Sequence, residues 1–175
     1  MEIFDLYDAG RRATGETMER YTPTPAGRFR LVVHILIFNS KGQLLIQQRK
    51  RTKSHWGGMW DVSVGGAVTA GEDSQLGAHR ELLEELGLDV DFSGIAPAVT
   101  TTFTGGFDDM YVLNMEPDLA SLKLQETEVE AVRWADQAEV LALIDSGDFI
   151  PYQKDLMAYL FFRRDHKGNF DIDRA

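Results

Sequence analysis

The sequence predicts an α+β fold in which helices pack on a mixed β-sheet. Strand-like and helix-like apolar patterns both occur, turn-forming residues join several strands as hairpins, and the elements run strands, helix, strands, helices. A doubly wound fold needs strands and helices that alternate regularly, so this order disfavours it. The length of 175 residues suits one domain with one sizeable core.

Each predicted element follows from its local composition. Strands are expected where β-branched and aromatic residues cluster between turn formers, at residues 30–38, 43–49, 60–64, 98–103, 110–115 and 128–134. Helices are expected where apolar residues recur at helical spacing, at residues 73–86, 136–145 and 152–163. The single domain 1–175 is divided into an N-terminal extension, residues 1–28, in which 3–7 and 17–20 pair as a hairpin, and a core, residues 29–165.

The composition excludes several classes of protein. With 28 acidic and 18 basic residues the net charge is −10, which repels nucleic-acid polymers. There is no cysteine, which excludes disulfides, thiolate metal sites and cysteine nucleophiles. The longest apolar run, residues 31–38, is too short to cross a membrane, and no secretory signal is present. We expect a cytoplasmic protein without a membrane partner, and its oligomeric state stays open, a homodimer being one alternative.

The helix at residues 73–86 has two distinct faces. Asp73 is expected to cap its N-terminus, and Gly87 is placed to end it in a left-handed conformation. With 3.6 residues per turn, one face carries Leu76, Leu82, Leu83 and Leu86, and the opposite face carries Glu81, Glu84 and Glu85. The prediction is that the leucine face packs into the core and the glutamate face points outward.

The glutamate face points to a metal site rather than to an ordinary solvated helix. Glu81 is spaced three and four residues from Glu84 and Glu85, where like charges cost about 0.2–0.5 kcal/mol per pair, and the helix carries no lysine. A cation would neutralise them. Three carboxylates without imidazole or thiolate form a hard oxygen site, which suits Mg²⁺ or Mn²⁺.

The segment from Gly66 to Leu88 resembles the Nudix box. All fixed positions of that motif are filled at the right spacing, by Gly66, Glu72, Arg80, Glu81, Leu82, Glu84, Glu85, Gly87 and Leu88. The resemblance implies an α/β/α sandwich with a mixed sheet and a catalytic loop–helix. It also implies a Mg²⁺-dependent hydrolase that cleaves the diphosphate bond of a nucleoside diphosphate derivative or a related small molecule.

The same resemblance implies residue roles. Glu84 and Glu85 would bind the metal, and Glu81 would be either a further ligand or the general base. Arg80 would hold a box glutamate in place by a charge-assisted hydrogen bond. The carbonyl of Gly65 would be an additional ligand. Structural roles within the box are implied for Gly66, Glu72 and Gly87.

The flanking segments, residues 34–49 and 55–67, are similar to those of isopentenyl-diphosphate isomerases and their Nudix relatives. In this alignment Gly65 stands where the isomerases have their cysteine, and Ala67 and Arg30 stand where they have metal-binding histidines. We therefore predict an isomerase-like Nudix hydrolase. The alternatives are an isoprenoid-diphosphate isomerase and a non-catalytic module that binds a nucleotide.

Several residues outside the box are further candidates. Arg49 either contacts a phosphate or forms a surface ion pair, and Trp56 is the better of the two nearby tryptophans for stacking on a ligand. The basic group Arg49, Lys50, Arg51 and Lys53 is either a solvated loop or a phosphate contact. Glu126 and Glu128 are favoured as a solvated strand entry over an additional catalytic carboxylate. Residues 103–109 are expected to form a mobile loop or a hairpin tip, and His34 a core histidine.

Overall fold

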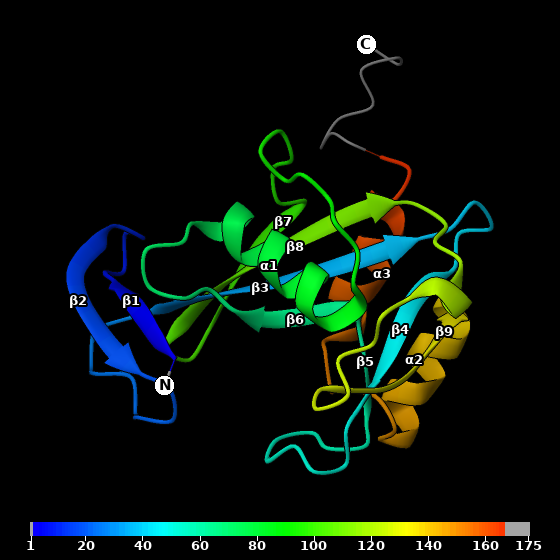
Figure 1. The fold of residues 1–175 in the computed structure, drawn as a ribbon, viewed down its shortest axis with the longest axis horizontal. Helices are drawn as coiled ribbons and strands as arrows, with labels where there is room; N and C mark the ends of the chain where they lie inside the picture. The colour runs from blue at the N-terminus through cyan, green and yellow to red at the C-terminus, as the bar shows by residue number, and fades with distance from the viewer. Residues whose placement is uncertain (1, 167–175) are drawn as a thin grey trace.

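A computed structural model describes residues 2–166, and it contains a seven-stranded mixed sheet with helices on both faces (Figure 1). The strands of this sheet are β3 (Arg30–Phe38), β4 (Leu44–Arg49), β5 (Trp60–Asp61), β6 (Val64–Ala67), β7 (Val99–Phe103), β8 (Gly106–Asn114) and β9 (Val129–Ala135). The helices are α1 (Ser74–Leu86), α2 (Gln137–Ser146), α3 (Lys154–Arg163) and the short 3₁₀ helix η1 (Leu119–Ser121). This is the α+β class that the sequence predicts. None of the described helices has the length and apolar character needed to cross a bilayer.

The central strand is β3, and three other strands pair with it. Strand β8 runs parallel to β3 along its whole length, while β6 pairs antiparallel with its first half, from Val32↔Ala67 to Ile35↔Val64. Strand β4 joins β3 only at Phe38↔Leu44 and then diverges to pair with β5 and β9. In the part of the chain that the structure describes, β6 pairs with β3 alone, so one edge of β6 stays open.

The alternation of side chains along β3 builds a core on each face of the sheet. Val33, Ile35 and Ile37 belong to the apolar cluster shared with α1, whereas Leu36 and Phe38 belong to the cluster shared with α2 and α3. The sheet is therefore the middle layer of an α/β/α sandwich (Figure 1). Even-numbered polar residues of β3 face the α2–α3 layer, the side opposite α1.

The strand predicted at residues 60–64 is divided into β5 and β6. Ser63 lies between them, where its hydroxyl accepts a hydrogen bond from the Ile37 amide (2.9 Å) and donates one to the Leu45 carbonyl (2.6 Å). One buried side chain thus satisfies backbone groups of both β3 and β4 where these strands separate. The chain crosses there from the edge of β4 to the edge of β3.

The segment 103–109 is part of a β-hairpin and not a loop over the substrate. Strands β7 and β8 pair up to Phe103↔Gly106, and Asp108 and Asp109 are buried within β8. The strand predicted at 110–115 therefore begins four residues earlier, at Gly106. The glycines and aspartates there resemble a turn locally, but long-range pairing with β3 continues the strand.

Helix α1 has the predicted ends but not the predicted orientation. Asp73 accepts a hydrogen bond from the Leu76 amide (2.9 Å), and Gly87 adopts φ 70° at the C-terminus. Two of the four leucines, Leu76 and Leu83, are exposed, so the predicted leucine face is wrong. The residues of α1 that are buried are Gly77, Ala78, Leu82, Glu85 and Leu86.

The small residues of α1 explain this rotation. A Cβ atom on Gly77 would lie 2.8 Å from a methyl group of Val68, so only glycine lets the preceding loop pack this closely. Helix α1 therefore docks through Gly77 and Ala78, and its glutamates turn towards the sheet.

The N-terminal hairpin consists of β1 (Ile3–Tyr7) and β2 (Ala13–Glu19), and it lies at the end of the sheet where β3 begins (Figure 1). Ile3 accepts a backbone hydrogen bond from Ala70 (2.8 Å), and the Asp5 carboxylate accepts one from the Gly71 amide (2.7 Å). The hairpin thus supports the loop that leads into α1.

An ion pair between Arg11 and Asp109 also anchors the hairpin to β8. Burial opposes ionisation of Asp109, but hydrogen bonds from Arg11, Ser74 and Thr100 outweigh it and lower the pKa of this carboxyl group. An acid whose pKa is lowered by folding contributes stability above its unfolded pKa, about 3.9. That stability is lost as the pH falls through the folded pKa.

We expect Asp109→Asn to be less stable at pH 7 and to lose less stability on acidification than the wild type. Chemical denaturation between pH 7 and pH 2.5 measures both effects. Asp145→Asn is the matched control, because Asp145 forms an exposed ion pair with Lys154. If Asp109→Asn and the wild type lose stability in parallel, the Arg11–Asp109 pair does not anchor the hairpin.

Candidate active site

The three box glutamates that lie on α1 line one small cavity on the inner side of this helix. This cavity has a volume of about 100 Å³ and is also bordered by Gly65 and Gly66 of β6. Glu85 is 4% exposed and accepts a hydrogen bond from Gln47 of β4 (2.9 Å). The Glu81 side chain is mostly buried, and that of Glu84 is half exposed. The prediction of an outward glutamate face is therefore wrong for Glu81 and Glu85.

Two consecutive glycines bring the backbone of β6 close to the site. A Cβ atom on Gly66 would overlap the carboxyl group of Glu81. A Cβ atom on Gly65 would lie 2.6–2.8 Å from the ring of His34 on the opposite side of the strand. The bare backbone therefore lets a carboxylate approach β6 from one side and an imidazole from the other.

Arg80 ties this helix to the loop before it. Its guanidinium donates to both carboxylate oxygens of Glu72 (2.8 and 3.0 Å) and to the carbonyl of Ala67 (2.9 Å). It also reaches Glu81 (2.9 Å) and Glu84 (3.3 Å). Burial opposes ionisation of Glu72, yet its hydrogen bonds from Arg80 and Thr69 lower the pKa of its carboxyl group. The loop is thereby closed onto α1.

Burial raises the pKa of both inner carboxyl groups. The pKa of Glu81 is raised although Arg80 favours its charged form, and the pKa of Glu85 is raised to about 8 by burial and by the neighbouring Glu81. Two acids that repel each other in a small buried cavity favour the binding of a cation between them.

The donor set fits a hard divalent cation, since it consists of carboxylate and backbone carbonyl oxygens only. Among residues 2–166, however, no three acidic or histidine side chains stand close enough together to hold an ion, and Arg80 pairs with two of the candidate ligands, Glu81 and Glu84. The Arg80–Glu84 contact is the longer of the two (3.3 Å), and Glu84 is half exposed, so this pairing is the weaker one.

The candidates outside the box lie around the same opening. Arg49 faces Asp61 at 3.4 Å, and its Nε is buried without a hydrogen-bond partner among the described residues. Trp56 stands at the rim, 49% exposed. Glu128 lines the glutamate cavity and pairs with Lys53, whereas Glu126 borders a different surface hollow. Of the two acids considered, only Glu128 is near the box.

A larger cavity, of about 620 Å³, lies on the other side of β6; Arg49 and Trp56 line it as well, whereas the sequence does not indicate Asp61, Asp108 or Tyr152 as part of a site. His34 and Asp108 form a hydrogen bond of 2.8 Å there, and the Tyr152 hydroxyl donates to Asp61 (2.8 Å). Burial alone would lower the pKa of His34, but the carboxylates of Asp108, Asp61 and Glu85 together outweigh it, so the pKa is raised. The sequence signal for Asp108 is weak, because the pair Asp108-Asp109 between Phe107 and Met110 fits a strand as well as a turn.

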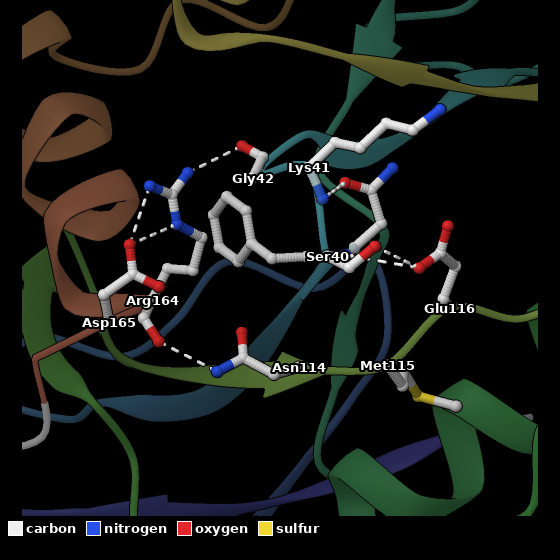
Figure 2. Close-up of a pocket in the computed structure, with 10 residues that line it drawn as sticks. Ser40, Lys41, Gly42, Asn114, Met115, Glu116, Arg164 and Asp165 are labelled. Carbon is white, nitrogen blue, oxygen red and sulfur yellow. Dashed lines mark hydrogen bonds and ion pairs between the residues drawn. The ribbon is translucent and has the colours of Figure 1, made fainter.

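A third hollow, at the far end of β3, has a structural role (Figure 2). Arg164 pairs with Asp165 (2.7 Å) and donates to the carbonyl of Gly42 (2.7 Å), and Ser40 donates to Glu116 (2.6 Å). These contacts fasten the end of α3 to the turn between β3 and β4.

The Nudix box implies a loop that is fixed to the helix after it, with the helix glutamates near the backbone of Gly65. The structure has this arrangement. Residues 28–168 match the NUDIX domain family, and the chain belongs to that family. An uncharacterized Nudix hydrolase of Listeria monocytogenes is 43% identical over 152 residues, 87% of this chain and 90% of that protein. The chain is accordingly a Nudix-type hydrolase, of the class that acts on diphosphate bonds.

One further relative and one solved structure are also similar to this chain. The isopentenyl-diphosphate Delta-isomerase of Pectobacterium atrosepticum is 36% identical over 98 residues, 56% of this chain and 52% of that protein. The crystal structure of DR0079 from Deinococcus radiodurans superposes with a TM-score of 0.74 at 28% identity, covering 94% of this chain and 99% of that one. These findings confirm the predicted fold and the predicted relationship to the isomerases.

The raised pKa of Glu85 gives a prediction for stability. An acid whose pKa is raised by folding contributes stability below its unfolded pKa, about 4.3, which is lost as the pH rises towards the folded value. In metal-free buffer the melting temperature of the wild type should therefore fall between pH 5 and pH 8, and that of Glu85→Gln should not. At pH 8 we expect the variant to melt higher, by about 2–4 °C for each kcal/mol of repulsion removed.

Calorimetry with and without Mg²⁺ makes this test specific. Mg²⁺ should raise the melting temperature of the wild type and leave that of Glu85→Gln almost unchanged. Glu126→Gln should behave as the wild type does. Equal pH profiles for the wild type and Glu85→Gln would show that Glu85 is not the strained carboxylate of the site.

Proposed function

We propose that the protein hydrolyses a diphosphate bond in a nucleoside diphosphate derivative or a related small molecule, with Mg²⁺ and by attack of water on phosphorus. The observation that supports this most is the inward turn of Glu81 and Glu85 onto the glycine backbone of β6. We propose Glu81, Glu84, Glu85 and the carbonyl of Gly65 as metal ligands, with Mn²⁺ as an alternative ion. We place this activity in the cytoplasm.

A bound divalent ion supplies neutralisation of the phosphate charge and lowers the pKa of water. The protein holds the carboxylates that would bind this ion in position. Gln47 fixes the carboxylate of Glu85 at the base of the cavity, and Arg80 orients Glu81 and Glu84 from the closed loop. Glu81 then either completes the ligand set or accepts the proton of the attacking water. Such a site works mainly through preorganised charges.

Substrate contacts are proposed for Arg49 and Trp56. Arg49 lines both the glutamate cavity and the larger cavity, and its Nε lacks an acceptor among residues 2–166. A phosphate oxygen at the opening between the two cavities would satisfy this group. Trp56, at the rim of the larger cavity, offers a ring face to the group that the phosphates carry.

Isomerisation is disfavoured by the surroundings of residue 65. The ring of His34 occupies the space that a side chain at this position would need, since a Cβ atom there would approach it to 2.6 Å. A cysteine at this position, where the isomerases carry theirs, would therefore require the His34 ring to shift. The similarity to isomerases supports a shared fold, and the box glutamates support hydrolysis.

A product screen over a panel of diphosphates, with Mg²⁺ and then Mn²⁺, tests the proposal. In ¹⁸O-labelled water we expect the label in a phosphoryl product, because water attacks phosphorus. Glu84→Gln should lower kcat by about 10²–10³-fold, the loss typical of one preorganised charge. Glu126→Gln, which alters an acid outside the site, should retain full activity.

Two outcomes would contradict the proposal. One is equal turnover by Glu84→Gln and the wild type. The other is conversion of isopentenyl diphosphate to its allylic isomer without loss of phosphate, which would assign the protein to the isomerases.

A further inference from the structure

Three cavities meet at two arginines. Arg20 of the segment after β2 and Arg49 at the end of β4 line the glutamate cavity, the larger cavity behind β6, and a third cavity of about 550 Å³. Under the proposed function, the diphosphate that is cut lies at this junction, with one substituent in the larger cavity. The third cavity is then open to the other end of the same substrate.

The cavity of about 550 Å³, which we call the arginine pocket, lies between the linker after β2 and the loop from β4 to β5. It is distinct from the hollow shown in Figure 2. Its charged lining consists of Arg20, Arg30, Arg49 and Lys53, and none of its described lining residues is an aspartate or a glutamate. The whole chain has a net charge of −10, so a cavity walled only by basic charges is a local reversal. Such a reversal concentrates anions.

The bases of the arginine pocket differ in how they are neutralised. Arg20 pairs with Glu2 (2.6 Å), Arg49 faces Asp61, and Lys53 pairs with Glu128, each partner standing outside the pocket.

Arg30 is the exception, because no carboxylate among residues 2–166 forms an ion pair with it. Its guanidinium lies half-buried, 5.7 Å from the centre of the Phe103 ring. Burial and the neighbouring Arg20 lower the pKa of Arg30. A cation that is partly desolvated beside another cation is costly unless an anion binds to it.

Two aromatic residues at the arginine pocket have an uncommon backbone conformation. Tyr21 and Trp56 adopt φ values of 72° and 57°, in the left-handed region that bulky residues seldom enter. Tyr21 is 80% exposed, so burial of its ring does not compensate for this conformation. Strain of this kind persists mostly at functional sites, and here it presents ring faces beside the basic wall.

We propose that the arginine pocket binds a further phosphoryl group of the substrate, beyond the diphosphate that is cut. Arg30 is its main ligand, and Arg20 and Arg49 connect it to the junction. The substrate is accordingly a diphosphate compound that carries at least one more phosphate, held in the arginine pocket beside Arg30, which also borders the larger cavity. This inference rests on the proposed function only for the position of the diphosphate.

Binding of inorganic pyrophosphate and tripolyphosphate tests the arginine pocket without catalysis. Calorimetric titration of the full chain in metal-free, low-salt buffer should give about tenfold tighter binding of tripolyphosphate, the effect of one added charged hydrogen bond. This comparison uses the wild type and needs no variant. Equal affinities for the two anions would overturn the proposal.

The residue assignment is tested by substitution. Arg30→Met should remove the preference for tripolyphosphate, and Arg30→Lys should retain part of it. Arg12→Met is the matched control, because Arg12 lies in the turn between β1 and β2 and lines none of the three cavities. If Arg30→Met, folded with an unchanged melting temperature, keeps the preference, the proposal is wrong.

Failure of this proposal is distinguishable from failure of the proposed function. Hydrolysis of diphosphates without an Arg30-dependent preference for tripolyphosphate overturns the arginine pocket alone. The preference without any hydrolysis supports the pocket, although the proposed function then fails.

Discussion

The site depends on the hydrogen bonds that the Arg80 guanidinium donates. This guanidinium binds Glu72 of the loop, the Ala67 carbonyl of β6 and two glutamates of its own helix. A single planar cation therefore fixes the end of a strand, the loop and the helix relative to one another. The helix docks through Gly77 and Ala78 with Glu81 and Glu85 against the sheet, and the burial of these two glutamates raises both pKa values. A raised pKa means that the ionised carboxylates of Glu81 and Glu85 destabilise the folded protein. Under the proposed function, these same carboxylates bind the metal.

The open edge of β6 explains why the site has more than one compartment. Glutamates approach this strand from the α1 side, while His34 and Asp108 approach from the α3 side. Only the glycine backbone of residues 65 and 66 separates the two groups. A side chain at residue 65 would meet the ring of His34, whereas one at residue 66 would meet the carboxyl group of Glu81. In this chain His34 fills the space beside residue 65.

Local features were predictable from the sequence, and features set by distant contacts were not. The caps Asp73 and Gly87 act within a few residues of themselves, so the ends of α1 follow from spacing alone. The orientation of α1 depends on the packing of Gly77 against Val68. The spacing of leucines along the helix does not predict that contact. The neighbours of Asp108 favour turns and predict a loop or a hairpin tip, whereas its partner His34 is 74 residues away. Pairing across such a separation is visible only in the folded chain.

The location of a bound ion tests the central claim most directly. A crystal of the wild-type protein soaked in Mn²⁺ and measured for anomalous scattering gives that position without any assay of activity. We predict a Mn²⁺ ion coordinated by Glu81, Glu84 and Glu85 and by the Gly65 carbonyl, with Glu84 rotated away from Arg80. A Mn²⁺ ion held instead between His34, Asp61 and Asp108, in the larger cavity, would contradict it.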